Sequence, residues 1–472
     1  MASRSLQTQM AGVEVAGQNL ANVNTPGYSR QRVIIQTDPA VQTGIGPEGT
    51  GASVQAIQQV VDTMLNGQIQ NQASQSGFWN TQQSALENLQ TSLNEFLDSA
   101  QNASAANANA ATTTSGLSDR IGAFFNALKS LATTPASIPA RQAVVGAAQT
   151  LATTFQQIDT RLSSLHTALD TSLNNQVTSA NQLLTDIASL NDQIANVENF
   201  SNGAANDLRD LRQQKLEALS SFLNYQSSTA ADGSVTVTAL TSQTLVSGNQ
   251  VVNALKTVAD PSSGQLHVWT ASNNNVLTGV PYGLTGGSLV GIVNVRDGEL
   301  TNLHNSIDQL ASNLIAQVNT LHGSGFNLAG GTGNALFTGG NAAGIAVNQT
   351  IATDPSLLQA SGTAGAAGNG SVALSLSQLA STALATLSNQ TFSGFYSQTV
   401  AQVGTALSNA NDQASTQTSV ANMLARQRSS VSGVNLDEEM TTLMTFQRAY
   451  QASAHVVTTV DQMIQVILAM KA

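Results

Sequence analysis

The sequence predicts a mainly α-helical protein with an inserted β domain. We expect a long helical bundle built from both chain ends as a coiled-coil inner domain, with the β-rich insertion as an outer domain. Apolar residues follow helical spacing at both ends and through much of the middle, whereas strand-like alternation begins only near residue 224. Neither Pro nor Gly interrupts the chain after Gly433.

The C-terminal segment 434–472 carries apolar residues at every seventh position. A second row follows three residues behind the first, and two such rows form the seam of a helix that packs along another helix. Asn435 and Glu438 resemble a capping box at the start of this helix, where acidic residues also suit the helix dipole. The two rows are Leu436, Leu443, Tyr450, Val457 and Ile464, and Glu439, Phe446, Ser453, Val460 and Ile467.

The first twenty residues predict a second helix of this kind. Its apolar row repeats at spacings of four and three, and Gly17 in that row would let two backbones approach closely. Periodicity leaves two interpretations open: each helix packs into a globular core, or the two ends pair with each other and with neighbouring copies. The row consists of Leu6, Met10, Val13, Gly17 and Leu20.

The segments between the first helix and residue 223 are mostly helical in pattern. Pro26-Gly27 indicates a turn, residues 33–35 begin an extended segment, and residues 44–51 form a loop. Helical spacing then covers 53–102, 117–131, 141–199 and 207–223, with a flexible connection at 103–115 and a pause at Pro135 and Pro139.

The pattern changes near Asn224, where Val235 and Val237 alternate with Thr after an Asp232-Gly233 turn. Helices are expected again at 289–321, 372–388 and 392–429, around a Gly-rich segment at 323–370. We therefore predict three domains: an inner terminal helical domain of 1–35 with 433–472, a helical bundle of 36–223 with 293–322 and 371–432, and a β-rich outer domain of 224–292 with 323–370.

The composition excludes several classes of function. The chain of 472 residues has a formal net charge of −11, which argues against nucleic-acid binding. It has no cysteine, so disulfides, thiolate metal sites and a Cys nucleophile are excluded. No signal peptide is visible and no apolar run is long enough to span a membrane, so we expect a protein that is soluble or secreted without a cleaved signal.

No catalytic, metal or cofactor site is predicted. The five histidines lie in different segments without metal-ligand spacing, and Gly330–Gly333 lacks the Lys and Ser or Thr of a phosphate-binding loop. The acidic residues 437–439 stand where a helix start favours negative charge. The sequence therefore predicts a protein that is not an enzyme.

Two motifs at opposite ends of the chain resemble a known family. The segment 17–31, Gly-Gln-Asn-Leu-Ala-Asn-Val-Asn-Thr-Pro-Gly-Tyr-Ser-Arg-Gln, resembles the signature of the axial proteins of bacterial flagella, which include rod, hook and hook-associated proteins. The segments 432–440, 446–454 and 460–461 resemble the matching C-terminal signature. Within the family, Ser-Gly-Val-Asn-Leu-Asp-Glu-Glu at 432–439 is most similar to the hook-associated type that joins hook to filament. Family members usually begin with several more residues before the first apolar helix position, so a shortened N-terminus is expected.

The resemblance implies a structural protein of the extracellular flagellum, exported unfolded. It implies self-association in a ring or helical layer, and contact with the hook protein and with the next hook-associated protein on the filament side. It also implies an export chaperone at the C-terminal region. Neither nucleic acid nor membrane is implied as a partner.

We expect assembly to occur through the chain ends, which bury little when isolated and so stay loose until neighbouring copies cover them. The alternatives are another axial protein, such as a hook or distal rod component, and a secreted adhesin or enzyme module carried on flagellar ends. The expected interface residues are Leu6, Met10, Val13, Leu20, Asn22, Asn24, Thr25, Pro26, Gly27, Tyr28, Leu436, Leu443, Phe446, Tyr450, Val457, Val460, Ile464 and Ile467.

Overall fold

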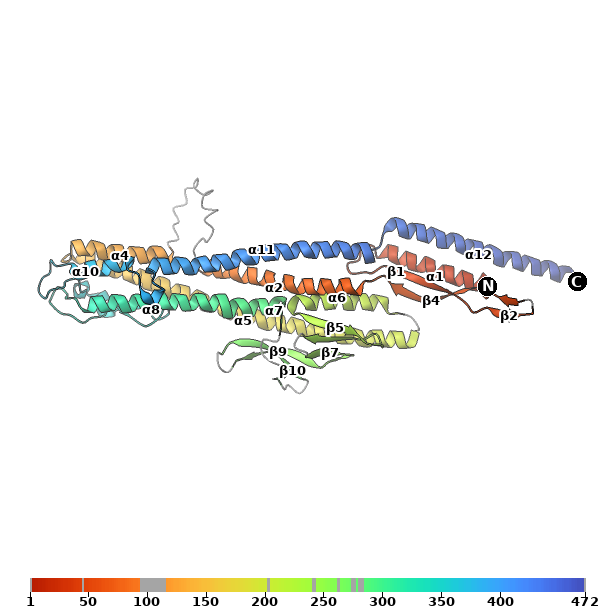
Figure 1. The fold of residues 1–472 in the computed structure, drawn as a ribbon, viewed down its shortest axis with the longest axis horizontal. Helices are drawn as coiled ribbons and strands as arrows, with labels where there is room; N and C mark the ends of the chain where they lie inside the picture. The colour runs from red at the N-terminus through yellow and green to blue at the C-terminus, as the bar shows by residue number, and fades with distance from the viewer. Residues whose placement is uncertain are drawn as a thin grey trace. The chain divides into compact units, whose positions relative to one another are not determined.

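The computed structural model describes residues 2–44, 46–93, 116–201, 204–239, 243–260, 264–272, 277–278 and 284–470. The chain forms two compact units: Met1–Phe78 with Asn175–Val290 and Ser415–Ala472, and Trp79–Asn174 with Gly291–Ala414. Figure 1 labels helices and strands of the chain. Four helices contribute residues to both units: α2 (Thr63–Leu93), α5 (Ile138–Ser201), α7 (Gly287–Asn294) and α11 (Phe392–Ser432). The expected flexible connection 103–115 lies outside the described residues.

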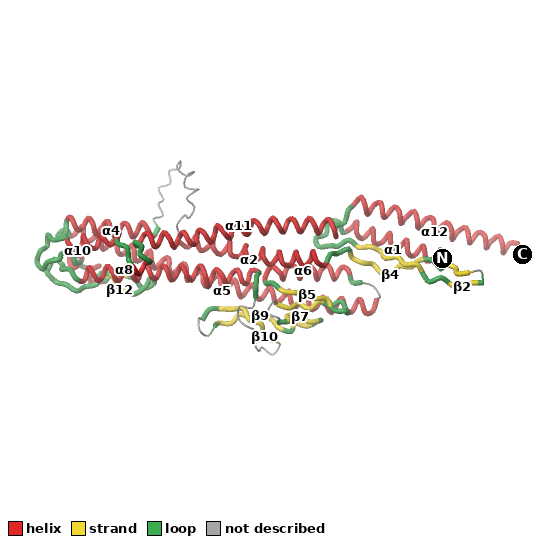
Figure 2. Tube along the Cα trace, viewed as in Figure 1, coloured by secondary structure: helices red, strands yellow, loops and turns green. Residues whose placement is uncertain are grey.

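Helices from both chain ends lie side by side in the first unit. They are α1 (Ala2–Ala21) and α12 (Leu436–Met470), and both confirm helices that the sequence predicts. Figure 2 shows α12 continuing past the start of α1. Asn435 caps α12 as expected, because its Oδ1 accepts the backbone N–H of Asp437 at 3.0 Å.

An antiparallel strand pair packs against α1, and one of its strands corrects the sequence analysis. β1 (Gln31–Thr37) pairs with β4 (Ala52–Gln59), although residues 53–59 were predicted to be helical. Val54 and Ala56 alternate with Ser53 and Gln55, a period of two that lets one face of the strand pack on the helix. The small β2 (Val41–Thr43) and β3 (Gly46–Glu48) form the hairpin between them.

The predicted β insertion follows α6 (Asn206–Phe222) as two antiparallel sheets. One has the order β5 (Tyr225–Thr229), β6 (Val235–Ala239), β7 (Thr244–Ser247), β8 (Gln250–Val251); the other has β11 (Leu277–Thr278), β10 (Leu266–Ser272), β9 (Asn253–Ala259). Val235, Val237 and Ala239 of β6 are buried, whereas the Thr residues between them are partly exposed. This alternation confirms the pattern that predicted the strands.

The second unit is a helical bundle with an aromatic core. It includes α4 (Leu117–Thr133), a π-helical turn (Val295–Leu300), α8 (Thr301–Gly323) and α10 (Ser371–Gln378). The Phe124 ring lies 5.5 Å from that of Phe337, and the Phe125 ring lies 5.8 Å from that of Phe392. All four phenyl side chains are buried, so residues from distant parts of the sequence share one core.

The Gly-rich segment 323–370 belongs to the second unit, whereas residues 224–290 belong to the first. The two segments that we assigned to one β-rich domain therefore fall in different compact units. The Gly-rich segment contains β12 (Phe337–Thr338), β13 (Ala346–Val347), α9 (Gln349–Thr353) and a 3₁₀ turn (Pro355–Leu357). Polar side chains of the bundle hold it: Asn319 Oδ1 accepts the Phe337 amide at 2.9 Å, and buried Arg141 donates to the Leu358 carbonyl.

The predicted helix 372–388 is shorter in the structure. After α10 the chain forms 3₁₀ turns at Leu379–Ser381 and Ala385–Leu387. Ser388 and Asn389 then adopt φ values of 56° and 59°, in the left-handed region that a continuing helix cannot use. Apolar spacing alone did not show this end.

Candidate interaction site at the paired chain ends

α1 and α12 run antiparallel in a seven-residue register. Asn19 Nδ2 lies 3.2 Å from Glu439 Oε2, Gly12 faces the Phe446 ring, and Ser5 Oγ lies 2.8 Å from Ser453 Oγ. Each step back by seven residues along α1 is matched by a step forward of seven along α12. One of the two predicted rows of α12 therefore faces α1, and it is the row that contains the polar residues.

A glycine permits the close approach of these helices, but it is Gly12 rather than the predicted Gly17. A Cβ atom at Gly12 would lie 2.5 Å from Phe446 Cδ1, which is far inside van der Waals contact. A Cβ at Gly17 would meet nothing within 4 Å. Gly12 thus provides the space that the Phe446 ring fills.

The fully buried residues of α1 differ from its predicted apolar row. The fully buried residues of α1 are Thr8, Gly12, Val15, Ala16 and Asn19. The predicted residues Leu6, Val13 and Leu20 are only partly buried, and Met10 is 61% exposed. The contacts with α12 at Ser5, Gly12 and Asn19 involve small and polar residues, and Met10 of the apolar row lies at the surface.

The other predicted row of α12 is mostly uncovered within the chain. Leu443 is partly buried, whereas Leu436, Tyr450, Val457 and Ile464 are exposed. Val460 and Ile467, which end the row that faces α1, are 43% and 64% exposed. We call residues 456–470 the distal segment of α12. Its exposed large apolar residues are Val456, Val457, Val460, Met463, Ile464, Val466, Ile467, Leu468 and Met470.

The N-terminal motif forms a polar cluster around Asn19, whose side chain is buried. Asn19 Oδ1 accepts hydrogen bonds from the Gln31 amide and the Tyr28 hydroxyl, both at 2.9 Å. Its Nδ2 donates to the Gln31 carbonyl at 2.8 Å as well as to Glu439. One side chain therefore joins α1, β1, the motif loop and α12.

The loop that leads from α1 to β1 is fixed by its own residues. Asn22 Nδ2 donates to the Gln18 carbonyl, and Asn22 Oδ1 accepts the Thr25 hydroxyl, each at 3.0 Å. Gly27 has φ 79°, where a side chain would be strained and would meet Gln214. The remaining predicted residues of the loop, Asn24, Thr25 and Pro26, are exposed.

Arg30 joins this loop to the corner between α11 and α12. Its Nε lies 2.6 Å from Glu439 Oε1, its Nη1 lies 3.0 Å from Glu438 Oε2, and its backbone N–H donates to the Ser432 carbonyl at 2.9 Å. Glu439 is only 2% exposed, so the Arg30 guanidinium rather than water balances its charge. The motifs from the two ends of the sequence thus meet in one cluster, which we call the latch (Asn19, Tyr28, Arg30, Gln31 and Glu439).

Two carboxylates of α6 extend the latch. Asp210 accepts the Ser29 amide at 2.9 Å and the Ser29 hydroxyl at 2.7 Å, and Asp207 accepts the Gln31 side-chain amide at 3.0 Å. Burial raises the pKa of Asp210 above its ordinary value. Burial and then the nearby carboxylates of Asp207, Asp210 and Glu439 raise the pKa of Tyr28 to about 12. Tyr28 therefore stays a neutral hydrogen-bond donor at physiological pH.

A polar groove of about 790 Å³ opens beside the motif loop. Its walls come from the loop, α2, α6, β5 and α11, and include Asn71, Gln213 and Arg428. Arg428 is paired with Glu217, Nη1 to Oε1 at 2.6 Å. The amide and paired charged side chains of the groove can form hydrogen bonds with a partner. The groove and the latch together therefore form a surface suited to binding and positioning a partner.

Three latch residues lie within the sequence motifs but were not among the expected interface residues: Asn19, Arg30 and Glu439. Glu439 and Ser453 gave the one available signal, because they are polar positions in an otherwise apolar row. Asp207 and Asp210 gave no signal, since their partners lie about 180 residues away in the sequence.

Comparisons with known proteins identify the fold and the family. A family model described as the flagellar hook-associated protein FlgK helical domain matches residues 105–337, and one described as the flagellar basal body rod FlgEFG protein C-terminal matches residues 425–470. The chain is 28% identical to flagellar hook-associated protein 1 of Bacillus subtilis, over 99% of this chain and 96% of that one. It is 23% identical to the protein of the same name from Escherichia coli, over 99% and 98%.

The fold is that of a solved structure, the flagellar hook junction protein FlgK from Burkholderia pseudomallei. The TM-score is 0.67 with 17% sequence identity, over 78% of this chain and all of that one. Among the described residues, none of the helices combines the length and apolar character that crossing a bilayer requires.

The paired end helices, the latch built from both terminal motifs and the matched C-terminal model define an axial structural protein of the bacterial flagellum. Such a protein is located in the extracellular flagellum and is not an enzyme. The chain belongs to the family of flagellar hook-associated protein 1, FlgK.

Proposed function

We propose that the chain forms the junction between hook and filament by self-assembly through its terminal helices. The observation that carries this proposal is the distal segment of α12. Its apolar side chains are exposed in the single chain, and a large exposed apolar patch on a protein is an interaction surface. Neighbouring copies in a ring or helical layer would cover it.

The latch supports the same proposal because it fixes where the distal segment points. Arg30 and Asn19 hold the first turn of α12 to α1 and β1, and the α1–α12 register then continues to Ser5 and Ser453. The distal segment follows Ser453 along α12 and its large apolar residues are exposed. Our sequence-based expectation that both end helices lack cover in the monomer therefore applies to the distal segment, while α1 and the first half of α12 cover each other.

We further propose the partners that this arrangement requires. The hook protein and the next hook-associated protein on the filament side would contact the assembled layer. An export chaperone would cover the C-terminal region before assembly, because an exposed apolar helix otherwise promotes aggregation. Residues 1–35 with 433–472 would form the inner domain of the layer, and the two sheets between Tyr225 and Thr278 would form part of its outer surface.

A double substitution tests the proposal. Val457→Asp with Ile464→Asp places two carboxylates in the distal segment, where burial against a neighbour would leave them without a partner. We expect binding of the labelled variant to purified hook–basal bodies to fall at least about 100-fold, because about 1.4 kcal/mol changes an equilibrium constant tenfold.

The matched control is Leu211→Asp with Leu374→Asp, which changes two similarly exposed apolar residues outside the terminal helices. The control variant should bind like the unmodified chain. Normal incorporation of the Val457 and Ile464 variant would refute the mechanism. If antibodies against the protein labelled the whole hook shaft rather than its tip, the result would instead favour a hook component.

A further inference from the structure

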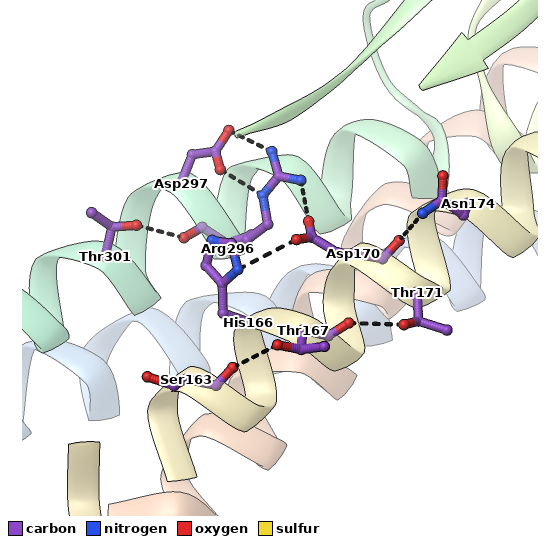
Figure 3. A network of polar contacts seen from close by, with 9 residues as sticks. All are labelled: Ser163, His166, Thr167, Asp170, Thr171, Asn174, Arg296, Asp297 and Thr301. Atoms are coloured by element: carbon purple, nitrogen blue, oxygen red, sulfur yellow. Dashed lines mark hydrogen bonds and ion pairs between the residues drawn. The ribbon is translucent and has the colours of Figure 1, made fainter. Parts of the chain in front are cut away.

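The contact between α5 and α8 in the second unit carries two groups of charged residues. In the first group, Arg296 of the π-helical turn is fully buried and lies between two carboxylates (Figure 3). Its Nη1 is 2.6 Å from Asp170 Oδ1, and its Nε is 2.6 Å from Asp297 Oδ1. His166 Nδ1 lies 3.4 Å from the other oxygen of Asp170. The Arg296 guanidinium thus forms an ion pair with each of the carboxylates of Asp170 and Asp297.

The second group consists of Asp159 of α5 with His304 and Asp308 of α8. One ligand atom from each of the three residues lies within 4.8 Å of the other two. His304 Nε2 is 2.7 Å from Asp159 Oδ1, and Asp308 Oδ1 accepts the Ala342 amide at 2.9 Å. All three side chains are partly buried, and two rigid helices supply them.

The two groups differ in how their charge is balanced. Two carboxylates lie close to His304 as two lie close to Arg296, but an imidazole, unlike a guanidinium, can serve as a metal ligand. Among the described residues, Asp159 forms an ion pair with His304. Neither Asp159 nor Asp308 forms an ion pair with a Lys or Arg of the described residues. A bound divalent cation would offset this charge.

We propose that Asp159, His304 and Asp308 form a Zn²⁺ site. One imidazole nitrogen and two carboxylate oxygens are a donor set that Zn²⁺ accepts in four-coordinate sites, with water as the fourth ligand. Ca²⁺ takes six to eight oxygen ligands, and Mg²⁺ prefers oxygen ligands in octahedral geometry, so both fit this set less well.

The surroundings support a metal ligand role for each residue. His304 and Asp308 are four residues apart on α8 and so lie on one face of the helix, as paired ligands on helices do. The Ala342 amide holds one oxygen of Asp308 and orients the carboxylate, which is the usual role of a hydrogen bond behind a metal ligand. No metal site was predicted from the sequence, because the five histidines lack metal-ligand spacing and spacing does not place Asp159 beside α8.

The test is an isothermal calorimetric titration of the chelator-treated full-length protein with ZnCl₂. Zinc X-ray absorption of the loaded protein then identifies the ligands. We expect one Zn²⁺ per chain with a single imidazole in its coordination shell. His304→Gln and Asp308→Asn should each weaken binding at least about tenfold. The matched control is His166→Gln, which lies seven residues after Asp159 on α5 and is paired with Asp170, and it should bind Zn²⁺ like the unmodified protein.

Absence of saturable binding would overturn the proposal, as would equal loss in the His304 and His166 variants, which would indicate adventitious binding by surface histidines. Tighter binding of MgCl₂ or CaCl₂ than of ZnCl₂ would overturn the choice of metal. If circular dichroism shows that His304→Gln does not fold, Asp159→Asn replaces it, since it keeps the side-chain shape and removes one charged ligand.

Discussion

Replacing Asn19 with alanine tests the latch at its centre. The side chain is 1% exposed and makes four hydrogen bonds, two with the Gln31 backbone and one each with Tyr28 and Glu439. At about 1 kcal/mol net for each bond, the substitution removes about 4 kcal/mol. Alanine also leaves the Gln31 amide and carbonyl without partners in a buried site, so the loss is not offset by new bonds to water.

Hydrogen–deuterium exchange of the free protein measures this loss locally. The Gln31 amide donates to Asn19 itself, and the Arg30 amide donates to Ser432, so both report opening of the latch. A loss of about 4 kcal/mol corresponds to roughly a thousandfold faster exchange at these amides when opening is the limiting equilibrium.

Asn24→Ala is the matched control, because Asn24 lies in the same loop but is exposed. It should leave exchange at residue 31 within about twofold of the unmodified chain. Unchanged exchange in the Asn19 variant, or an equal increase in both variants, would refute the conclusion that Asn19 holds the two chain ends together.

Two further predictions concern the same region. Gly12→Val should destabilise the α1–α12 contact by about 1–3 kcal/mol, because its Cβ would lie 2.5 Å from a ring carbon across the helix pair; exchange at α1 amides measures this. The Tyr28 hydroxyl should ionise near pH 12 in the folded chain, against 10.0 when unfolded, as measured by ultraviolet difference titration against Tyr28→Phe. Because the folded chain holds this proton more tightly, its contribution to stability is complete below pH 10 and is lost as the pH rises from 10 to 12.

Each of these predictions has its own contradicting result. Gly17→Ala is the control for Gly12, since its Cβ would meet nothing and alanine favours a helix by about 0.5–1 kcal/mol. Equal destabilisation by both substitutions would show that Gly12 has no special packing role. A Tyr28 titration at about 10 would show that the hydroxyl is not buried among the carboxylates.

The strongest periodic segments could be predicted from the sequence. The heptad rows of 434–472 gave α12 because no Pro or Gly interrupts them, and alternation at Val235 and Val237 gave β6. The strand β4 was missed, since Ile57 also fits a helical spacing with Val60 and Val61. Only its pairing with β1 selects the period of two.

The partners within the latch could not be predicted from spacing. Arg30 and Glu439 are separated by more than 400 residues. The sequence contains other Arg and Glu residues, so residue type alone does not indicate that these two form an ion pair. The residue at which α1 approaches α12 most closely could not be predicted either. The Phe446 ring packs against Gly12, and it fits there because glycine has no side chain. Hydrophobic patterning does not detect such a position.

Our central claim is that the single chain covers the latch and leaves the distal segment of α12 for neighbouring copies. Hydrogen–deuterium exchange of the same protein, free in solution and incorporated at purified hooks, tests it most directly. We predict that residues 19–31 are protected in both states and that residues 456–470 exchange rapidly when free and slowly when assembled. Strong protection of residues 456–470 in the free protein, or no gain on assembly, would contradict the account.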